Sequence, residues 1–265
     1  EVYKMKNGGL ITKTINTPTT SSASGVWSLQ EQYEAETNDA WPKAVDPNAI
    51  TDPYFSDVKL LVKFDGTNNS TTYTDSSSNN IAITSDGNAN ISNAVTKFGN
   101  TSGYFGSGTT GRIKFTEIQF VDANVDFTME TWFNPTNGSA DGALCGSASS
   151  GNHQMFRFNG GGTAGKVLIY NNGHMFNYTG TTYFTSNTWY HVAVTRENNV
   201  CRFFIDGVLQ ATNSNFNKYI RLDSIGTGYN RRDSFVGYMD EFRITNNVAR
   251  YTANFTPPTA GFPTS

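Results

Sequence analysis

The stretch WYHVAVTRENNVCRFFIDGVLQA, from Trp189 to Ala211, alternates with a two-residue period, and this period constrains the fold more than any other feature of the chain. Successive side chains of a strand point to opposite faces, so Tyr190, Val192 and Val194 share one face. The dipeptide Asp206-Gly207 is a strong signal for a tight hairpin turn. The stretch therefore predicts three consecutive antiparallel strands.

Similar short runs, bounded by Asn, Gly, Asp and Ser, continue along the chain with no helical pattern between them. This arrangement favours an all-β sandwich or barrel over an α/β fold. The predicted strands cover residues 58–64, 81–85, 103–106, 112–116, 125–134, 154–158, 166–171, 174–178, 189–196, 200–206, 208–213, 219–225 and 235–245.

Six residues of these strands are expected in the interior, namely Trp189, Val192, Val194, Phe203, Ile205 and Phe242. Trp189 and Val192 lie on opposite faces of their strand. One of these faces must therefore pack against a second layer, for which residues 25–50 are the candidate.

The chain divides into three segments. Residues 1–24 are polar and end in a Thr/Ser-rich run, which predicts an extended N-terminal arm. Residues 25–50 form a Trp-containing connector, in which Ser28 and Glu31 have the spacing of a capping box and predict one short helix. Residues 51–265 carry the predicted strands and form the sandwich.

Composition excludes several classes of protein. The net charge is −3 and no basic run occurs, so the chain lacks the electrostatic footprint of a nucleic-acid-binding protein. No apolar run is long enough to span a membrane. Cys145 and Cys201 lie in apolar strand-like surroundings, which favours buried free thiols, although a single disulfide stays open.

No residues form a recognisable catalytic constellation. The three histidines, His153, His174 and His191, are widely separated and lack the spacing of a zinc site. Asp240 and Glu241 are adjacent on a predicted strand, so we expect their side chains on opposite faces rather than paired for glycoside hydrolysis. We therefore expect a protein that is not an enzyme.

Several separated motifs resemble laminin-G-like domains of the concanavalin A type. They are FDGTNNSTTYTDSSSNN, KFGNTSGYF, WYHVAV with FFIDGV, and GYMDEFRITNNVARYTANFTPP, and together they extend over about residues 54–260. The resemblance implies a two-sheet antiparallel jelly-roll sandwich. This combination of motifs is similar to domains of bacteriophage structural proteins, including capsid-surface and tail proteins.

The resemblance also implies a structural calcium ion at a loop edge. Calcium prefers hard oxygen ligands. The matching positions are Asp65, Asp75 and Asp240, with Asn79 as a neutral oxygen donor. The alternative is that these residues only form Asx turns and strand ends without a metal.

The resemblance favours a non-enzymatic virion protein, such as a capsid decoration, head-fibre or tail-fibre component that could also bind surface glycans. Within the arm, the run GLITKTI alternates like an edge strand, so we expect the arm to contact other virion proteins and the chain to form homo-oligomers on the virion surface. The alternative is a secreted carbohydrate-binding lectin or adhesin, and a glycan lyase or hydrolase is less favoured. The candidate sugar-stacking aromatic residues are Tyr170, Phe176, Tyr178 and Tyr183.

Overall fold

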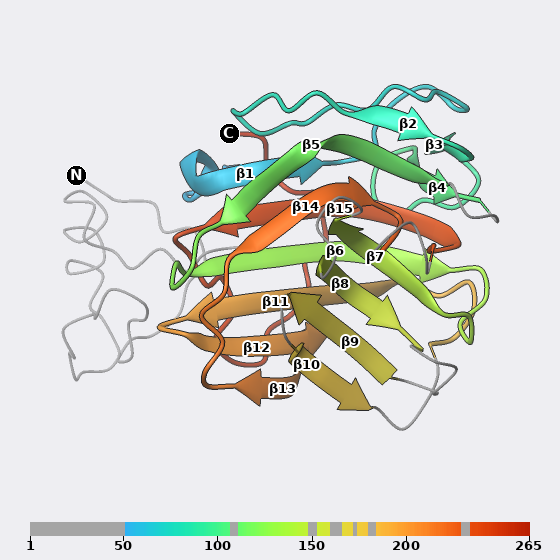
Figure 1. Ribbon diagram of the computed structural model, residues 1–265. Helices are drawn as coiled ribbons and strands as arrows, with labels where there is room; N and C mark the ends of the chain where they lie inside the picture. Colours follow the sequence, from blue (N-terminus) through green and yellow to red (C-terminus); the bar gives the residue numbers. More distant parts are fainter. Residues whose placement is uncertain are drawn as a thin grey trace, which may run out of the picture. The chain divides into compact units, whose positions relative to one another are not determined.

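The fold was analysed in a computed structural model of the whole chain (Figure 1). The structure describes residues 51–106, 111–147, 153–159, 166–171, 174–179, 184–228 and 234–265. The predicted arm, the connector with its helix, and Tyr183 lie outside the described residues.

The described residues form two antiparallel sheets that pack face to face (Figure 1). The larger sheet has eight strands in the order β13-β12-β11-β6-β15-β4-β3, with β1 also paired to β15. The smaller sheet has seven strands in the order β10-β9-β8-β7-β14-β5-β2. The predicted all-β jelly-roll sandwich is thus confirmed.

The strands of the larger sheet are β1 (Val58–Val62), β3 (Ala89–Ser92), β4 (Ser102–Phe105), β6 (Phe127–Pro135), β11 (Tyr190–Glu197), β12 (Val200–Ile205), β13 (Val208–Asn213) and β15 (Gly237–Asn246). Those of the smaller sheet are β2 (Thr84–Asp86), β5 (Arg112–Val121), β7 (Gly142–Ser147), β8 (His153–Phe158), β9 (Lys166–Asn171), β10 (His174–Thr179) and β14 (Ile220–Ile225). One short 3₁₀ turn, η1 (Phe55–Asp57), precedes β1, and none of the described residues forms a helix able to cross a membrane.

The hairpin at Asp206-Gly207 forms as predicted. Both residues have positive φ, 47° and 74°, the geometry that a two-residue turn between twisted strands requires. β12 and β13 pair on either side of it. The strand pattern missed β3 and β7. Every residue of β7 (GALCGS) is buried, so this strand has no polar face to produce an alternation.

Aromatic side chains fill the space between the two sheets. Phe133 of β6 stacks on Phe158 of β8, with ring centroids 4.5 Å apart and an interplanar angle of 8°. Such a pair adds about 0.5–1.5 kcal/mol to the stabilisation from burial. Four predicted interior residues, Val192, Val194, Phe203 and Phe242, are fully buried, and Ile205 packs against the core while half-buried.

Trp189 is the exception, because it lies outside the core. It precedes β11 and is half-buried on the outer face of the larger sheet. The interior position next to it is taken by Tyr190, which packs against the core. The alternation of the strand therefore holds, but the prediction placed the tryptophan on the wrong face.

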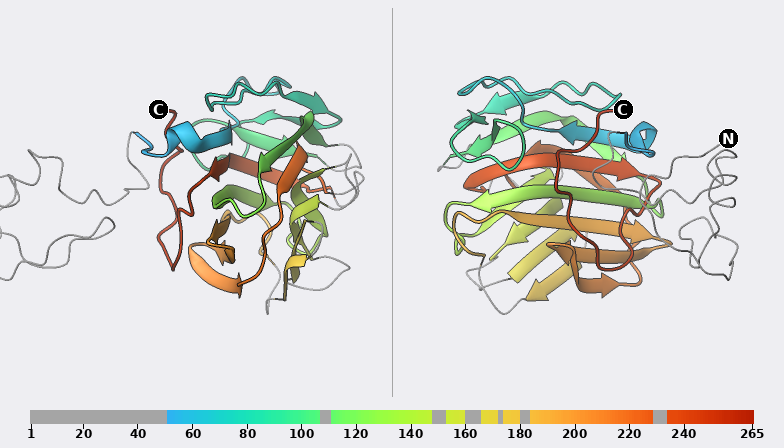
Figure 2. Two further views of the ribbon diagram at one scale, coloured as in Figure 1. Left: turned by 60° about the vertical axis from the view of Figure 1, so that its left-hand side comes forward. Right: turned by 180° about the vertical axis from the view of Figure 1, so that it is seen from behind.

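The outer face of the larger sheet carries a second layer made by residues 248–265, here named the C-terminal strap. The strap crosses β11, β6 and β15 (Figure 2). Within it, Tyr251 and Phe255 stack with centroids 3.6 Å apart, and the Phe255 ring lies 5.7 Å from that of His191. The Phe255 amide donates to the Gly207 carbonyl oxygen over 2.9 Å. The second layer expected from residues 25–50 is thus provided, among the described residues, by the chain's other end.

Buried ionic groups fix the strap to the sheet. Arg243 of β15 lies between Glu130 of β6 and Asp52, and Arg250 of the strap also contacts Asp52, with an N–O distance of 2.7 Å. The Tyr251 hydroxyl donates to Glu130 over 2.9 Å. Two carboxylates and two guanidinium groups balance in charge, so each buried charge of the cluster has a partner of opposite sign.

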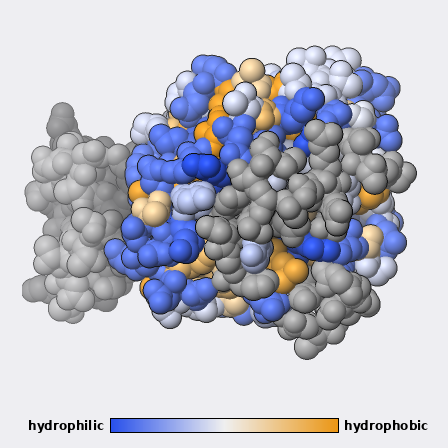
Figure 3. Space-filling model, in the orientation of Figure 1, coloured by the Kyte–Doolittle hydropathy of each residue, from blue (hydrophilic) through white to orange (hydrophobic). Residues whose placement is uncertain are grey.

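The outer face of the smaller sheet is mainly polar. Hydrophilic residues dominate the coloured surface in Figure 3, and hydrophobic residues are scattered between them.

The two cysteines do not form a disulfide. Cys145 of β7 and Cys201 of β12 are buried in different sheets and are free thiols, as favoured by the sequence. Burial raises the pKa of Cys201 to about 12 and that of Cys145 well above its ordinary value.

Candidate functional site

A groove of about 550 Å³ opens on the outer face of the larger sheet, beside the C-terminal strap. Five aromatic or charged side chains come from the sheet and its loops, and the strap forms one wall. The lining residues are Lys97, Phe98, Trp132, Trp189, Asp206 and residues 256–259.

Trp132 forms the floor of this groove. Its neighbour Phe133 points into the core, so the indole of Trp132 points outward from β6. The Phe98 ring meets the indole edge-on at a centroid distance of 5.9 Å, and the His191 ring lies 5.1 Å away on the other side. The indole is only 6% exposed, and its Nε1 has no hydrogen-bond partner among the described residues.

Lys97 is the only positively charged residue among the described residues that line the groove. Its Nζ lies 3.7 Å from the centroid of the Trp132 ring and 5.5 Å from that of Phe98, a cation–π arrangement. Burial lowers the pKa of Lys97, while Asp206 and Asp240 oppose this shift. The ammonium group is thus held against the aromatic floor with nearby carboxylates.

Asp206 borders the groove from the β12–β13 turn. Its Oδ1 accepts a hydrogen bond from the amide of His191 over 2.8 Å, which fixes the turn to β11. Gly207, the next residue, lies so close to the strap that an added Cβ would come within 1.9 Å of the Phe255 carbonyl oxygen. The turn and the strap therefore hold each other in place.

Asp240 supports the groove from below. Its Oδ2 accepts hydrogen bonds from the amides of Lys97 and Phe98, over 3.3 and 3.1 Å, and so positions both lining residues. Burial raises the pKa of Asp240 to about 8; the two amides oppose this shift, whereas Glu241 and Asp65 add to it.

The expectation that Asp240 and Glu241 point to opposite faces was wrong. The β15–β6 register shifts between Asp240 and Arg243, and Glu241 has a φ of 53°, so a β-bulge interrupts the alternation. Neither side chain enters the core. Glu241 contacts Lys63 at 3.1 Å and accepts from the Phe262 amide of the strap over 2.9 Å. Both carboxylates are thus engaged in holding loops and the strap.

The four expected calcium ligands form two separate groups of contacts. Asp75 accepts from the amides of Leu61, Ser77 and Ile81 and from the Ser77 hydroxyl. Asn79 uses its amide nitrogen, which donates to the Val58 carbonyl oxygen over 3.0 Å. Together they fasten the 75–81 loop to β1.

The other expected ligands are Asp65, which is exposed, and Asp240 below the groove. Among the described residues, no group of three or more His, Cys, Asp or Glu side chains is arranged to hold a metal ion. The carboxylate of Asp75 already accepts four hydrogen bonds, which is the capacity of its two oxygens. The residues therefore do not form a ready calcium site, and calcium binding stays a prediction of the resemblance.

The expected sugar-stacking residues lie on the smaller sheet. Phe176 is 4% exposed and packs near Phe203, with centroids 6.1 Å apart, so its ring belongs to the core rather than to the surface. Tyr178 is half-buried, lies 6.0 Å from Phe203 and donates to Gln210 over 2.9 Å. Tyr170 is half-buried on β9. These positions remain untested as ligand contacts.

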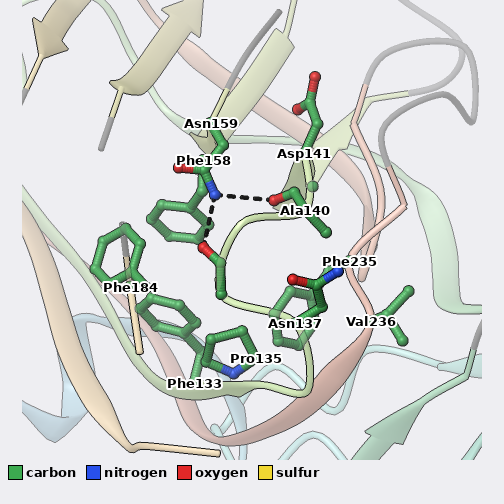
Figure 4. Close-up of a pocket in the computed structure, with 12 residues that line it drawn as sticks. Phe133, Pro135, Asn137, Ala140, Asp141, Phe158, Asn159, Phe184, Phe235 and Val236 are labelled. Atoms are coloured by element: carbon green, nitrogen blue, oxygen red, sulfur yellow. Dashed lines mark hydrogen bonds between the residues drawn. The ribbon is translucent and has the colours of Figure 1, made fainter. Parts of the chain in front are cut away.

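A second cavity lies at one end of the sandwich and is much smaller. Phe133, Phe158, Phe184 and Phe235 surround it, and Asp141 points away from it (Figure 4). The Asn159 amide closes one side by donating to the carbonyl oxygens of Gly138 and Ala140, over 2.9 and 3.0 Å. Its volume of about 20 Å³ suits a water molecule and not a ligand.

Comparison with known proteins identifies the family. The family model described as the concanavalin A-like lectin/glucanases superfamily matches residues 105–250. The chain belongs to this superfamily. No curated protein matches the chain. The sequence analysis did not place Trp132 and Trp189 in one site, because only the pairing of β6 with β11 brings them together. The available signal was that each tryptophan is next in sequence to an aromatic residue of the opposite face, Phe133 and Tyr190.

Solved structures are similar to this chain at low sequence identity. Domain 4 of an extracellular GH43 arabinanase from Geobacillus stearothermophilus, in complex with arabinotriose, has a TM-score of 0.52 and 17% identity over 71% of this chain and 91% of that chain. A Trypanosoma rangeli sialidase in complex with 2,3-difluorosialic acid has a TM-score of 0.46 and 11% identity, over 74% of this chain and 31% of that chain. These similarities describe the fold alone.

Proposed function

We propose that this superfamily member is a non-catalytic carbohydrate-binding domain and that its ligand occupies the groove beside the strap. The observation that carries the proposal is the pairing of two tryptophans, Trp132 and Trp189, with Lys97 and Asp206 in one open groove.

The chemistry of the groove suits a sugar. A sugar ring presents C–H groups on its faces and hydroxyl groups around its edge, so it needs a flat apolar surface bordered by donors and acceptors. The half-buried indole of Trp189 supplies the flat surface, and the buried indole of Trp132 forms the floor beneath Lys97. Lys97 donates hydrogen bonds and Asp206 accepts them, and both are charged, which strengthens bonds to hydroxyl groups.

The comparisons support this proposal at the level of the fold. The arabinanase domain with a TM-score of 0.52 is in complex with arabinotriose, and the family model is described by lectins and glucanases. From this comparison we take only the chemical class of the ligand, a saccharide, and not the position at which it binds. The secreted lectin considered from the sequence is therefore favoured over the virion component.

Absence of catalysis is part of the proposal. Asp240 and Glu241 share one side of the bulged β15, but the first accepts two backbone amides and the second contacts Lys63 and a strap amide. A general acid and a nucleophile would have to be available to the glycosidic bond. We therefore assign these carboxylates to structural support of the groove.

The proposal includes the protein's location and partners. A carbohydrate-binding domain would act outside the cell or on a particle surface, and its partners would be glycans. Attachment to a virion and homo-oligomer formation stay predictions, because the arm on which they rest lies outside the described residues. Calcium likewise stays a prediction, to be tested by chelation.

A glycan array tests the proposed function with a matched pair of variants. Trp189→Ala removes one wall of the groove, whereas Tyr170→Ala removes a half-buried aromatic ring from the smaller sheet. We expect wild type and Tyr170→Ala to bind the same glycans and Trp189→Ala to lose at least about tenfold in affinity. Loss of binding only in Tyr170→Ala would move the site to the smaller sheet, and absence of any bound glycan would refute the function.

A further inference from the structure

The groove is one end of a row of outward-facing side chains that crosses the larger sheet. Asn90 of β3 pairs with Tyr104 of β4, which pairs with Tyr238 of β15. Tyr238 in turn pairs with Asn134 of β6. Because Tyr190 pairs with Phe133, the residue before it, Trp189, continues the register beside Asn134.

The residues of this row share the outer face of the sheet. Each has a neighbour along its strand that lies in the core, for example Phe105 beside Tyr104 and Met239 beside Tyr238. The two tyrosine rings lie 5.1 Å apart at an angle of 43°, and both side chains are half-buried. They therefore form a second aromatic surface on the same face as Trp189.

Two buried polar atoms, one in the row and one beside it, have no hydrogen-bond partner among the residues that the structure describes. Asn134 is 2% exposed, and its Oδ1 has no hydrogen-bond partner among the described residues. The Nε1 of Trp132, two residues away on the same face of β6, is equally unpartnered. A buried polar atom without a partner is costly, by roughly 1–3 kcal/mol, and such atoms are exceptional in folded proteins. An acceptor and a donor in this position fit a ligand rich in hydroxyl groups.

A second hollow marks the far end of the row. It has a volume of about 440 Å³ and is lined by polar side chains, glycines and Tyr104, namely Asn69, Thr71, Gly87, Asn88, Ala89, Asn90, Tyr104 and Gly106. Tyr104 and Asn90 thus belong both to the row and to this hollow, as Trp189 belongs to the row and to the groove.

The row is too long for a single sugar ring. It crosses five strands, and neighbouring strands are about 4.8 Å apart, so its ends lie roughly 19 Å from each other. All five side chains of the row are uncharged, and the charged residues Lys97 and Asp206 are confined to the groove at one end. A partner that matches both features is a linear chain of neutral sugar units.

We propose that the groove and the polar hollow are two ends of one extended site, which binds a linear neutral oligosaccharide lying across β11, β6, β15, β4 and β3. This inference rests on the proposed function. In this site Trp189 holds one end, the Tyr104–Tyr238 pair holds a later sugar unit, and Asn134 hydrogen-bonds the chain between them.

The test compares short and long members of the same glycans. Dimers and hexamers of linear arabinan, xylan, mannan and cellulose are titrated calorimetrically into wild type, Trp189→Ala and Tyr104→Ala. We expect at least one hexamer to bind about tenfold more tightly than its dimer. Tyr104→Ala should weaken hexamer binding about fivefold and leave dimer binding unchanged, whereas Trp189→Ala should weaken both.

Several results would overturn the extended site and leave the proposed function intact. They are equal affinity for dimer and hexamer, an unchanged hexamer affinity in Tyr104→Ala, or binding on the array of acidic glycans alone. A shift of oligomeric state in Tyr104→Ala on size-exclusion chromatography, without a change in glycan binding, would make this face a self-association surface. If Tyr104→Ala does not fold, Asn90→Ala tests the same end. If no glycan on the array binds, both the proposed function and the extended site are refuted.

Discussion

The guanidinium group of Arg243 lies 2.7 and 3.0 Å, through its Nη2 and Nε atoms, from the Oε1 of Glu130, and neither residue is more than 4% exposed. This contact joins the two central strands of the larger sheet, β15 and β6. Since Tyr251 of the strap donates to the other Glu130 oxygen, the same carboxylate also fixes the layer that forms one wall of the groove.

Glu130→Gln should therefore destabilise the whole domain. It removes one of the two carboxylates that contact Arg243 and leaves the buried cluster with an excess positive charge. Breaking a buried ion pair in this way typically costs about 3–5 kcal/mol. Urea unfolding measures this loss. Tyr251→Phe serves as the matched control, because it removes a single hydrogen bond to the same carboxylate and should cost about 1–2 kcal/mol. Equal stability of Glu130→Gln and wild type would show that the ion pair contributes nothing.

The same group predicts how stability depends on pH. Burial alone would raise the pKa of Glu130, but Arg243, His191 and Arg250 together bring it well below its ordinary value. A carboxyl whose pKa falls on folding binds protons more readily in the unfolded chain, so its contribution is present above about pH 4.3 and is lost as the pH falls further. Melting temperatures between pH 7 and pH 3 should drop less steeply in Glu130→Gln than in wild type. Parallel curves would contradict this assignment.

Gly207 should tolerate no side chain. Its φ is 74°, and an added Cβ would lie 1.9 Å from the Phe255 carbonyl oxygen, so alanine must displace the strap or the turn. Gly207→Ala should lower the free energy of unfolding by about 1–3 kcal/mol and weaken glycan binding, because Asp206 and the strap both border the groove. Gly66→Ala is the control, since its Cβ would meet only Ile91 at 3.5 Å or more. A neutral Gly207→Ala would mean that the strap moves freely.

A substitution of Asp75 tests whether this residue binds a metal ion or only anchors its loop through hydrogen bonds. Its four hydrogen bonds tie the 75–81 loop to β1, so Asp75→Asn should destabilise the domain by about 2 kcal/mol or more in the presence and in the absence of a chelator. Thermal melting of wild type and Asp75→Asn, with and without EDTA, checks this. If EDTA lowers the melting temperature of wild type but not that of the variant, Asp75 is a calcium ligand.

Local signals were sufficient for much of the fold. Asp206-Gly207 predicted its hairpin because the turn needs two positive φ angles, and Val192 and Val194 followed from strand alternation. Strand β7 was missed because burial on both faces removes that alternation. The bulge at Glu241 was missed because an extra residue in a strand depends on the register with β6, which one strand's sequence does not contain.

The candidate site was less accessible to prediction than the fold. Trp132 and Trp189 belong to different strands, and only the pairing of β6 with β11 places them in one groove. The sequence drew attention to the aromatic residues of β9 and β10, where Phe176 turned out to be a core residue. An alternating strand indicates which residues share a face, but it does not indicate whether that face meets the core, the strap or solvent.

Nuclear magnetic resonance of the tryptophan indole N–H groups tests the central claim most directly. The glycan that binds most tightly on the array is titrated into ¹⁵N-labelled protein, with signals assigned from Trp132→Phe and Trp189→Phe. We predict that the signals of Trp132 and Trp189 shift together and saturate with the calorimetric affinity, because both rings line the groove and the Nε1 of Trp132 has no hydrogen-bond partner in the described part of the chain. A bound glycan that leaves both signals unchanged would place the carbohydrate elsewhere and contradict the account.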